Sequence, residues 1–141
     1  MEKTVANSFY TAEQARAFAE RWLPAWSGNN PEGLAAFYTD DVYYEDAGIP
    51  GGAQGKPALL AYFRKLLGQN PDWVWTQRRA APMEDGFVNY WHAAIPVGPQ
   101  TLEVDGVCLV QLRNGLIYRN EVFFDRTELV GAIRSLHRNK P

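Results

Sequence analysis

The chain has 141 residues, of which 46% are apolar and 21% charged, and this composition is typical of one globular domain spanning residues 1–141. Fourteen basic against sixteen acidic residues leave a net charge of −2, so the positive field that nucleic-acid binding requires is missing. One cysteine and two histidines exclude an internal disulfide and a structural zinc site, and no apolar run approaches the roughly 20 residues of a membrane span. We therefore expect a cytoplasmic protein with no metal, nucleic-acid or membrane partner.

The N-terminal part of the chain has helical periodicity. Thr11 and Gln14 form a capping-box pattern, and an apolar stripe of about four turns follows as far as Trp26. Pro24 lies inside this stripe, where it removes a backbone hydrogen bond. We expect a helix whose last turn is kinked or ends early.

A second short helix is expected from Pro31, with Asn30 as its cap and Tyr38 among its inward side chains. Residues 42–46 alternate in polarity and predict a short strand. The glycine-rich segment 47–55 is expected to be a flexible loop, and the leucines after Pro57 predict a third helix that stops near Gly68.

From Trp73 onward the apolar period changes from 3.6 to 2, with turn signals between the runs. This predicts an antiparallel meander of four strands over residues 73–82, 87–96, 101–112 and 116–124. Asp125 then caps a short closing helix. Helices gathered first and strands gathered last are typical of an α+β domain in which a curved antiparallel sheet wraps around N-terminal helices. The concave mouth of such a sheet favours a small-molecule site.

Two segments resemble a known family. The run FYTDDVYYEDAGIPGGAQGKPALLAYF (residues 37–63) and the tail GLIYRNEVFFDRTELVGAI (residues 115–133) are similar to the NTF2-like superfamily, especially its SnoaL-like polyketide cyclase and ketosteroid isomerase branches. The resemblance implies a cone-shaped α+β barrel with an apolar pocket, usually dimeric and without a cofactor.

The resemblance also implies site residues. Asp46 lies where ketosteroid isomerases keep their general base, and further positions correspond to the pocket: Tyr38, Tyr62, Phe63, Asn120, Val122 and Phe124. Two positions depart from the isomerase pattern. Trp22 replaces the tyrosine that donates to the developing oxyanion, and the second, protonated aspartate corresponds to Val107 or Cys108. Such donors supply a few kcal/mol of transition-state stabilisation, so the steroid reaction by that route is not expected.

The residue pattern supports Asp46 independently. Alternation places Asp46 on the same strand face as Val42 and Tyr44, and an apolar surrounding makes a carboxylate a stronger base. The alternative is that Asp46 only caps the turn before Gly48 by accepting backbone hydrogen bonds. From the sequence both remain open.

Other candidates follow from polarity and alternation. Trp22 and Tyr44 each carry a polar tip that needs a partner when buried. Asn89 shares the face of Trp91 and is a candidate pocket group, whereas His92 is expected on the opposite face. The pocket is therefore expected to be enclosed by aromatic side chains from several elements, with Asn89 and Asn120 as polar groups.

Two functional classes remain. The first is a cofactor-independent enzyme acting on a small apolar carbonyl compound by isomerisation or aldol-type cyclisation, with Asp46 as acid and base. The second is a non-catalytic module that binds an apolar ligand or a protein. Epoxide hydrolysis is a weaker hypothesis, because this reaction needs a cooperating acid and base and only one inward carboxylate is expected. A homodimer is expected through the outer face of the meander, which carries Tyr90, Val107, Leu109 and Phe123 among polar groups.

Overall fold

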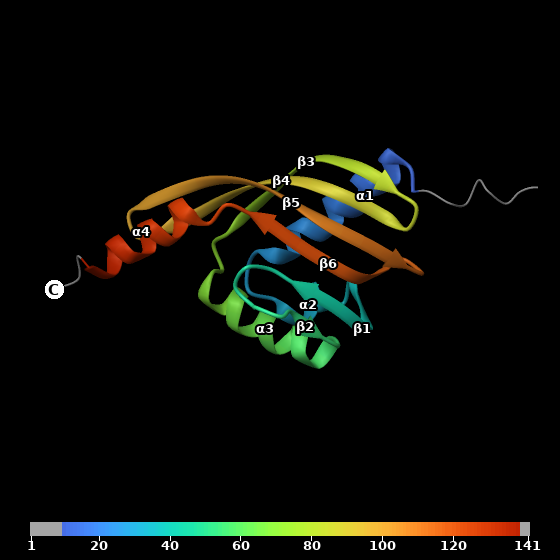
Figure 1. Ribbon diagram of the computed structural model, residues 1–141, viewed down its shortest axis with the longest axis horizontal. Coiled ribbons are helices and arrows are strands. Elements are labelled where there is room, and N and C mark those ends of the chain that lie inside the picture. Colours follow the sequence, from blue (N-terminus) through green and yellow to red (C-terminus); the bar gives the residue numbers. More distant parts are fainter. Residues whose placement is uncertain (1–9, 139–141) are drawn as a thin grey trace, which may run out of the picture.

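The structure is a computed structural model that describes residues 10–138. Within these residues, four α-helices and a 3₁₀ helix accompany six strands (Figure 1). In chain order the elements are α1 (Ala12–Trp22), η2 (Leu23–Trp26), α2 (Pro31–Ala35), β1 (Tyr38–Glu45), β2 (Ala53–Gln54), α3 (Lys56–Gln69), β3 (Val74–Met83), β4 (Gly86–Val97), β5 (Gln100–Arg113), β6 (Leu116–Phe124) and α4 (Thr127–Arg138).

The first helix begins and ends as its sequence predicts. The backbone N–H of Gln14 donates to the Thr11 hydroxyl at 3.0 Å, and the Gln14 side chain accepts from the Thr11 N–H at 2.9 Å, which completes the capping box. Regular α-helix stops at Trp22, and the chain continues as the 3₁₀ helix η2, whose second residue is Pro24. The prediction that the proline ends the α-helix early is confirmed.

The sheet has the strand order β2-β1-β6-β5-β4-β3 and is open. Strands β3 to β6 form the predicted antiparallel meander, whereas β1 pairs with β6 in parallel. Figure 1 shows the long strands curving over α1, α2 and α3, which lie on the concave side. The α+β class, with a curved sheet around N-terminal helices, is confirmed.

Two local predictions were wrong. The second helix does not reach Tyr38: it ends at Ala35, and β1 begins at Tyr38, four residues before the predicted strand. The cause is a long-range pairing, because Tyr38 lies opposite Ile117 of β6. The segment predicted to be only a flexible loop contains β2, which pairs with the end of β1.

The two faces of the meander differ as predicted. On the concave face Asn89 and Trp91 of β4 are buried, and on the convex face Tyr90 is 41% exposed and Phe123 of β6 is 53% exposed. Glu103 and Asp105 of β5 are exposed as well, and His92 lies beside them. Within residues 10–138, no helix has the length and apolar character that crossing a membrane demands.

His92 forms a charged cluster on the convex face. Its Nδ1 lies 2.9 Å from Asp105 Oδ1, its Nε2 contacts Glu103, and Arg78 binds Asp105 at 2.7 Å. The hydrogen bond to Asp105, together with that to Glu103, raises the pKa of His92. Stability from this cluster is therefore full below the unfolded pKa of about 6.5 and is lost as pH rises through the higher folded pKa.

We expect His92→Gln to remove this pH dependence. Urea unfolding at about pH 6 and about pH 8.5 should show a larger difference in the wild type than in His92→Gln, by less than about 1 kcal/mol because the cluster is exposed to solvent. Equal pH dependence in the two proteins would contradict the assignment.

Candidate functional site

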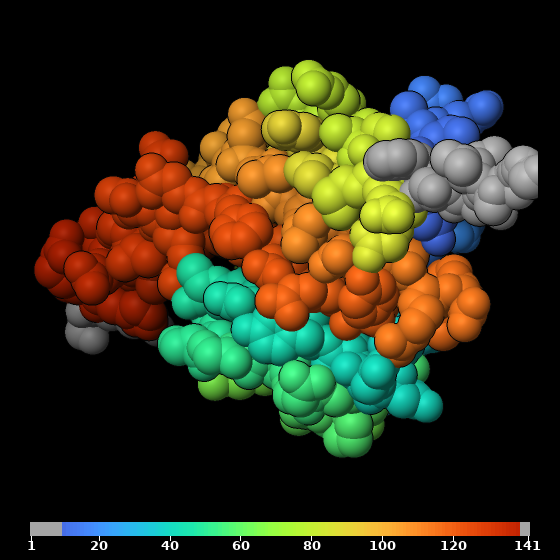
Figure 2. Space-filling model, turned by 45° about the vertical axis from the view of Figure 1, so that its right-hand side comes forward, coloured from blue at the N-terminus to red at the C-terminus, as the bar shows by residue number. Residues whose placement is uncertain are grey.

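A cavity of about 540 Å³ lies between the concave face of the sheet, the C-terminal half of α3 and α4. All five tryptophans of the chain line it: Trp22, Trp26, Trp73, Trp75 and Trp91. One side of the cavity is formed by Leu129, Ile133 and Leu136 of α4. In Figure 2 the red atoms of α4 lie beside the teal atoms of the segment that follows β1. The tryptophans thus supply most of the aromatic lining, and α4 supplies aliphatic side chains.

The tryptophans form a connected aromatic wall. Ring centroids are 4.7 Å apart between Trp75 and Trp91, 5.5 Å between Trp73 and Trp75, and 6.0 Å between Trp26 and Trp75. The first two of these pairs meet edge to face, the arrangement that aromatic quadrupoles favour. The indole N–H groups of Trp73 and Trp75 are buried and have no hydrogen-bond partner among the described residues.

Asp46 is the polar centre of the cavity wall. Its Oδ2 accepts a hydrogen bond of 2.6 Å from the Tyr44 hydroxyl, and its Oδ1 accepts from the Tyr62 hydroxyl at 2.8 Å and from the Gly48 N–H at 2.7 Å. Tyr44 lies near the end of β1 and Asp46 directly follows that strand, and Tyr62 reaches both from α3. The bond to Gly48 is the turn cap that the sequence offered as an alternative. The same carboxylate also faces the cavity, so the two interpretations are compatible.

The two tyrosines act as fixed donors. Burial, reinforced by the negative charge of Asp46, raises the pKa of both the Tyr44 and the Tyr62 hydroxyl. Both hydroxyls therefore stay protonated at neutral pH and hold the carboxylate in place. The chemistry available here is that of one oriented carboxylate beside two neutral hydroxyls.

Gly48 makes this contact possible. A Cβ atom at position 48 would lie 2.8 Å from the Tyr62 oxygen and 3.2 Å from Asp46 Oδ1. We expect Gly48→Ala to displace Tyr62 from Asp46 and to destabilise the fold by about 1 to 3 kcal/mol in urea unfolding.

Gly131→Ala is the matched control for Gly48→Ala. Gly131 lies in α4, and a Cβ there would meet nothing within 4 Å. Because alanine favours helix over glycine, this variant is expected to be neutral or stabilised by up to about 1 kcal/mol. A Gly48→Ala protein as stable as Gly131→Ala would contradict the tight contact.

A second polar chain lies behind the cavity wall. Trp22 Nε1 donates to the Tyr38 hydroxyl at 3.3 Å, this hydroxyl donates to Asn120 Oδ1 at 2.9 Å, and Asn120 Nδ2 donates to the Leu109 carbonyl at 3.0 Å. In this series of hydrogen bonds, the Trp22 N–H, the Tyr38 hydroxyl and the Asn120 amide each donate to a partner inside the protein. The N–H of Trp22, whose position the resemblance assigns to the oxyanion-donating tyrosine, is engaged by Tyr38.

The predicted site residues thus separate into two groups. Seven line the cavity: Trp22, Tyr44, Asp46, Tyr62, Trp91, Val122 and Phe124. Four are fully buried and do not line it: Tyr38, Phe63, Asn89 and Asn120. Phe63 packs edge to face against Tyr38 and Tyr44 behind the wall, and Asn89 Oδ1 accepts from Gln77 at 3.2 Å.

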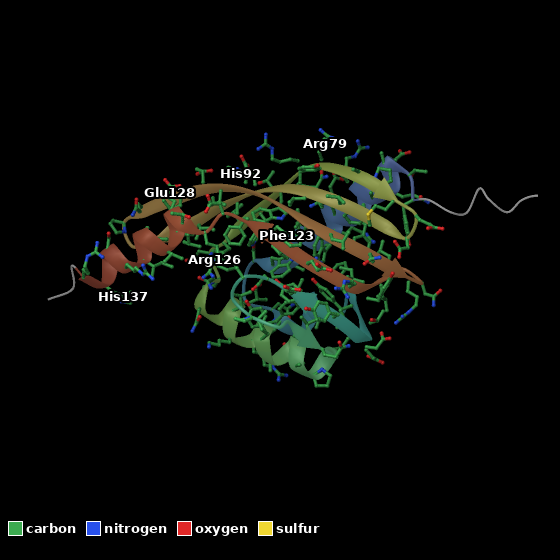
Figure 3. All side chains as sticks on the ribbon, in the orientation of Figure 1. Arg79, His92, Phe123, Arg126, Glu128 and His137 are labelled. Carbon is green, nitrogen blue, oxygen red and sulfur yellow. The ribbon has the colours of Figure 1, made fainter. Side chains whose placement is uncertain are left out.

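Among the cavity residues that sequence reasoning missed are Trp26, Trp73, Trp75 and Arg126. A signal existed for the tryptophans, since Trp26 follows Trp22 by one helical turn and Trp73 and Trp75 share a strand face. No signal existed for Arg126, whose Nη1 donates to the Ala47 carbonyl at 3.2 Å across 79 positions of sequence. Figure 3 shows Arg126 where the chain leaves β6 for α4, next to α3.

Nucleophilic and metal chemistry find little support here. Cys108 lines the cavity, but burial raises its pKa to about 12, so it is a neutral thiol. Among residues 10–138 no group of three or more His, Cys, Asp or Glu side chains is arranged to hold a metal ion.

Comparisons with known proteins agree with this architecture. A family model described as a SnoaL-like domain matches residues 19–120. A protein of ketosteroid isomerase-like fold from Catenulispora acidiphila, in complex with trimethylamine, is 18% identical with a TM-score of 0.73, over 83% of this chain and 92% of that one. TerC, co-crystallized with polyporic acid, is 16% identical with a TM-score of 0.72, over 85% and 98% of the two chains.

A third solved structure, Bal32a from a soil-derived mobile gene cassette, is 18% identical with a TM-score of 0.65, over 80% of this chain and 90% of that one. No curated protein matches the chain. At these identities the solved structures establish the fold alone, while the family model spans most of the chain. The chain belongs to the SnoaL-like domain family of the NTF2-like superfamily and has the ketosteroid isomerase-like fold.

Proposed function

We propose that the cavity binds a small apolar carbonyl compound and that Asp46 removes a proton from the carbon next to the carbonyl. The observation that supports this most is a carboxylate, held by Tyr44 and Tyr62, in the wall of a cavity of about 540 Å³ lined by every tryptophan of the chain. A cavity of this size accommodates a bicyclic or tricyclic molecule. The step needs no cofactor.

In the proposed reaction the indoles contact the apolar body of the substrate and leave its polar edge near Asp46. Asp46 accepts the proton, and the electron pair of the broken C–H bond moves into an enolate. The hydroxyls of Tyr44 and Tyr62 can rotate to accept a hydrogen bond from the protonated carboxyl. Return of the proton to another carbon completes an isomerisation. Alternatively, the enolate attacks a second carbonyl, and the alkoxide that forms takes the proton back from Asp46, which completes an aldol-type cyclisation.

A non-catalytic ligand-binding module is the second candidate. Indole faces attract alkylammonium cations, and Asp46 would supply a negative charge. The Catenulispora acidiphila protein, which has the same fold and was solved in complex with trimethylamine, supports this candidate. Such a module would bind its ligand without any proton transfer to carbon.

Hydrogen–deuterium exchange distinguishes the two candidates. We expect the wild-type protein to accelerate uptake of solvent deuterium next to the carbonyl of apolar cyclic ketones such as 2-tetralone, followed by NMR in D₂O. Because exchange reports on the first proton transfer alone, the final product need not be known. Binding of such ketones without accelerated exchange would favour the module and contradict the proposed enzyme.

We also propose that the protein forms a homodimer through the convex face of the sheet. Tyr90 and Phe123 are 41% and 53% exposed there, among the charged groups of Arg119 and Glu121, a mixture typical of interfaces. Sedimentation should give a dimer at micromolar concentration, and Phe123→Lys should give a monomer. A monomeric wild type would contradict this proposal.

A further inference from the structure

The mouth of the cavity carries an unused positive charge. Arg126 lines the cavity and is partly buried, and the only hydrogen bond of its side chain among residues 10–138 goes to the Ala47 carbonyl at 3.2 Å. None of the ion pairs among these residues includes Arg126. A guanidinium has five N–H donors and stays protonated in proteins, so most of its donors are available.

Asp46 does not neutralise this arginine directly. The carboxylate already accepts hydrogen bonds from Tyr44, Tyr62 and Gly48. The charge of Arg126 nevertheless reaches the site, since it opposes the rise in the pKa of Tyr62 that burial causes. The hydrogen-bonding capacity left at the mouth is therefore mainly that of a cationic donor, which an anionic oxygen satisfies best.

We propose that Arg126 is an anion-recognition residue and that the ligand of the cavity carries a carboxylate, bound at the mouth, with its apolar body among the tryptophans. This rests on the cavity being a ligand site, as in the proposed function, and adds the class of ligand: an apolar carboxylate. The side chain lies beside Ala47, the neighbour of Asp46, so the carboxylate of the ligand and the carbon that loses its proton would lie at the same end of the molecule.

Calorimetric titration with three matched compounds tests the proposal on the wild-type protein. The probes are 1-naphthaleneacetate, its methyl ester and 2-(1-naphthyl)ethylammonium, which share the aromatic body and differ in charge. We expect the carboxylate to bind about tenfold to a hundredfold more tightly than the ester, as a charge-assisted hydrogen bond allows. Equal affinity, or tightest binding of the ammonium compound, would overturn the proposal.

Variants then assign the preference to one side chain. Arg126→Gln keeps a donor for the Ala47 carbonyl and should reduce the preference for the carboxylate to near unity while leaving ester affinity unchanged, and Arg126→Lys should retain part of it. Arg79→Gln is the control, because Arg79 lies over the Tyr90 ring, 5.1 Å from its centroid, on the other side of the sheet (Figure 3). A preference that persists in Arg126→Gln overturns the role of Arg126.

The outcomes separate this proposal from the proposed function. Equal affinity for acid and ester overturns the anion site but leaves proton transfer by Asp46 standing. Failure of all three probes to bind at millimolar concentration counts against the cavity as a ligand site and overturns both.

Discussion

Asp46→Asn is expected to slow deuterium exchange into a bound ketone by about a hundredfold to ten-thousandfold, the usual contribution of a positioned general base. The amide has nearly the shape of the carboxylate and can still accept from Tyr44 and Tyr62 through its oxygen, but it cannot take up the proton. Affinity for the ketone should stay within about tenfold of the wild type, because the indoles supply most of the contact. Exchange rates by NMR and affinity by calorimetry measure the two quantities separately.

The neighbouring carboxylate provides a matched control. Glu45, the last residue of β1, directly precedes Asp46, accepts a hydrogen bond of 2.8 Å from the Tyr43 hydroxyl, and does not line the cavity. The Glu45→Gln variant should therefore catalyse deuterium exchange into the ketone at the wild-type rate. A wild-type exchange rate in Asp46→Asn, or equal losses of exchange rate in Asp46→Asn and Glu45→Gln, would show that Asp46 does not remove the proton.

Asn120→Leu is expected to reduce the free energy of unfolding by about 2 to 4 kcal/mol. Leucine has the same branching at Cγ but is larger than asparagine, and it leaves the Tyr38 hydroxyl without its acceptor and the Leu109 carbonyl without its side-chain donor. Tyr38 and Asn120 are fully buried, so water cannot substitute without a rearrangement. Urea unfolding followed by tryptophan fluorescence measures the loss.

Asn89→Leu is the counterpart that separates hydrogen bonding from packing. Asn89 is equally buried and lies on β4, two strands away from Asn120, but its Nδ2 has no partner among the described residues and its Oδ1 accepts only from Gln77. Removing an unpaired donor relieves a desolvation cost, and the overpacking by leucine is common to both sites, so this variant should lose about 1 to 2 kcal/mol less than Asn120→Leu. Equal losses at the two positions would show that the polar chain through Tyr38 stabilises nothing.

Much of the fold could be predicted from local signals. The capping box at Thr11, the proline at 24 and the alternation of the four meander strands each act over a few residues, and all three predictions agree with the structure. The start of β1 could not be predicted in this way. Tyr38 is a strand residue because it lies opposite Ile117, and a pairing across so much sequence leaves no local pattern.

The candidate site, like the fold, could be predicted only where local sequence signals determine it. Strand alternation places Tyr44 and Asp46 on one face, and this needs only neighbouring residues. The role of Gly48, which leaves room for Tyr62 beside Asp46, depends on the approach of α3 to the end of β1. Arg126 reaches the mouth of the cavity only because β6 ends beside the turn that follows β1, where Ala47 lies. Alternation also cannot tell a wall residue from one behind it, which is why Asn89 and Asn120 were predicted as pocket groups but lie in the core.

The most direct test of proton transfer by Asp46 is a crystal structure of the protein with 2-tetralone bound. The proposed function predicts that the aromatic ring of the ketone lies among Trp26, Trp75 and Trp91, with the carbon next to the carbonyl about 3 to 3.5 Å from a carboxylate oxygen of Asp46, the separation of a reactive complex. A ketone bound outside the cavity, or bound inside it with that carbon turned away from Asp46, would contradict the proposed function.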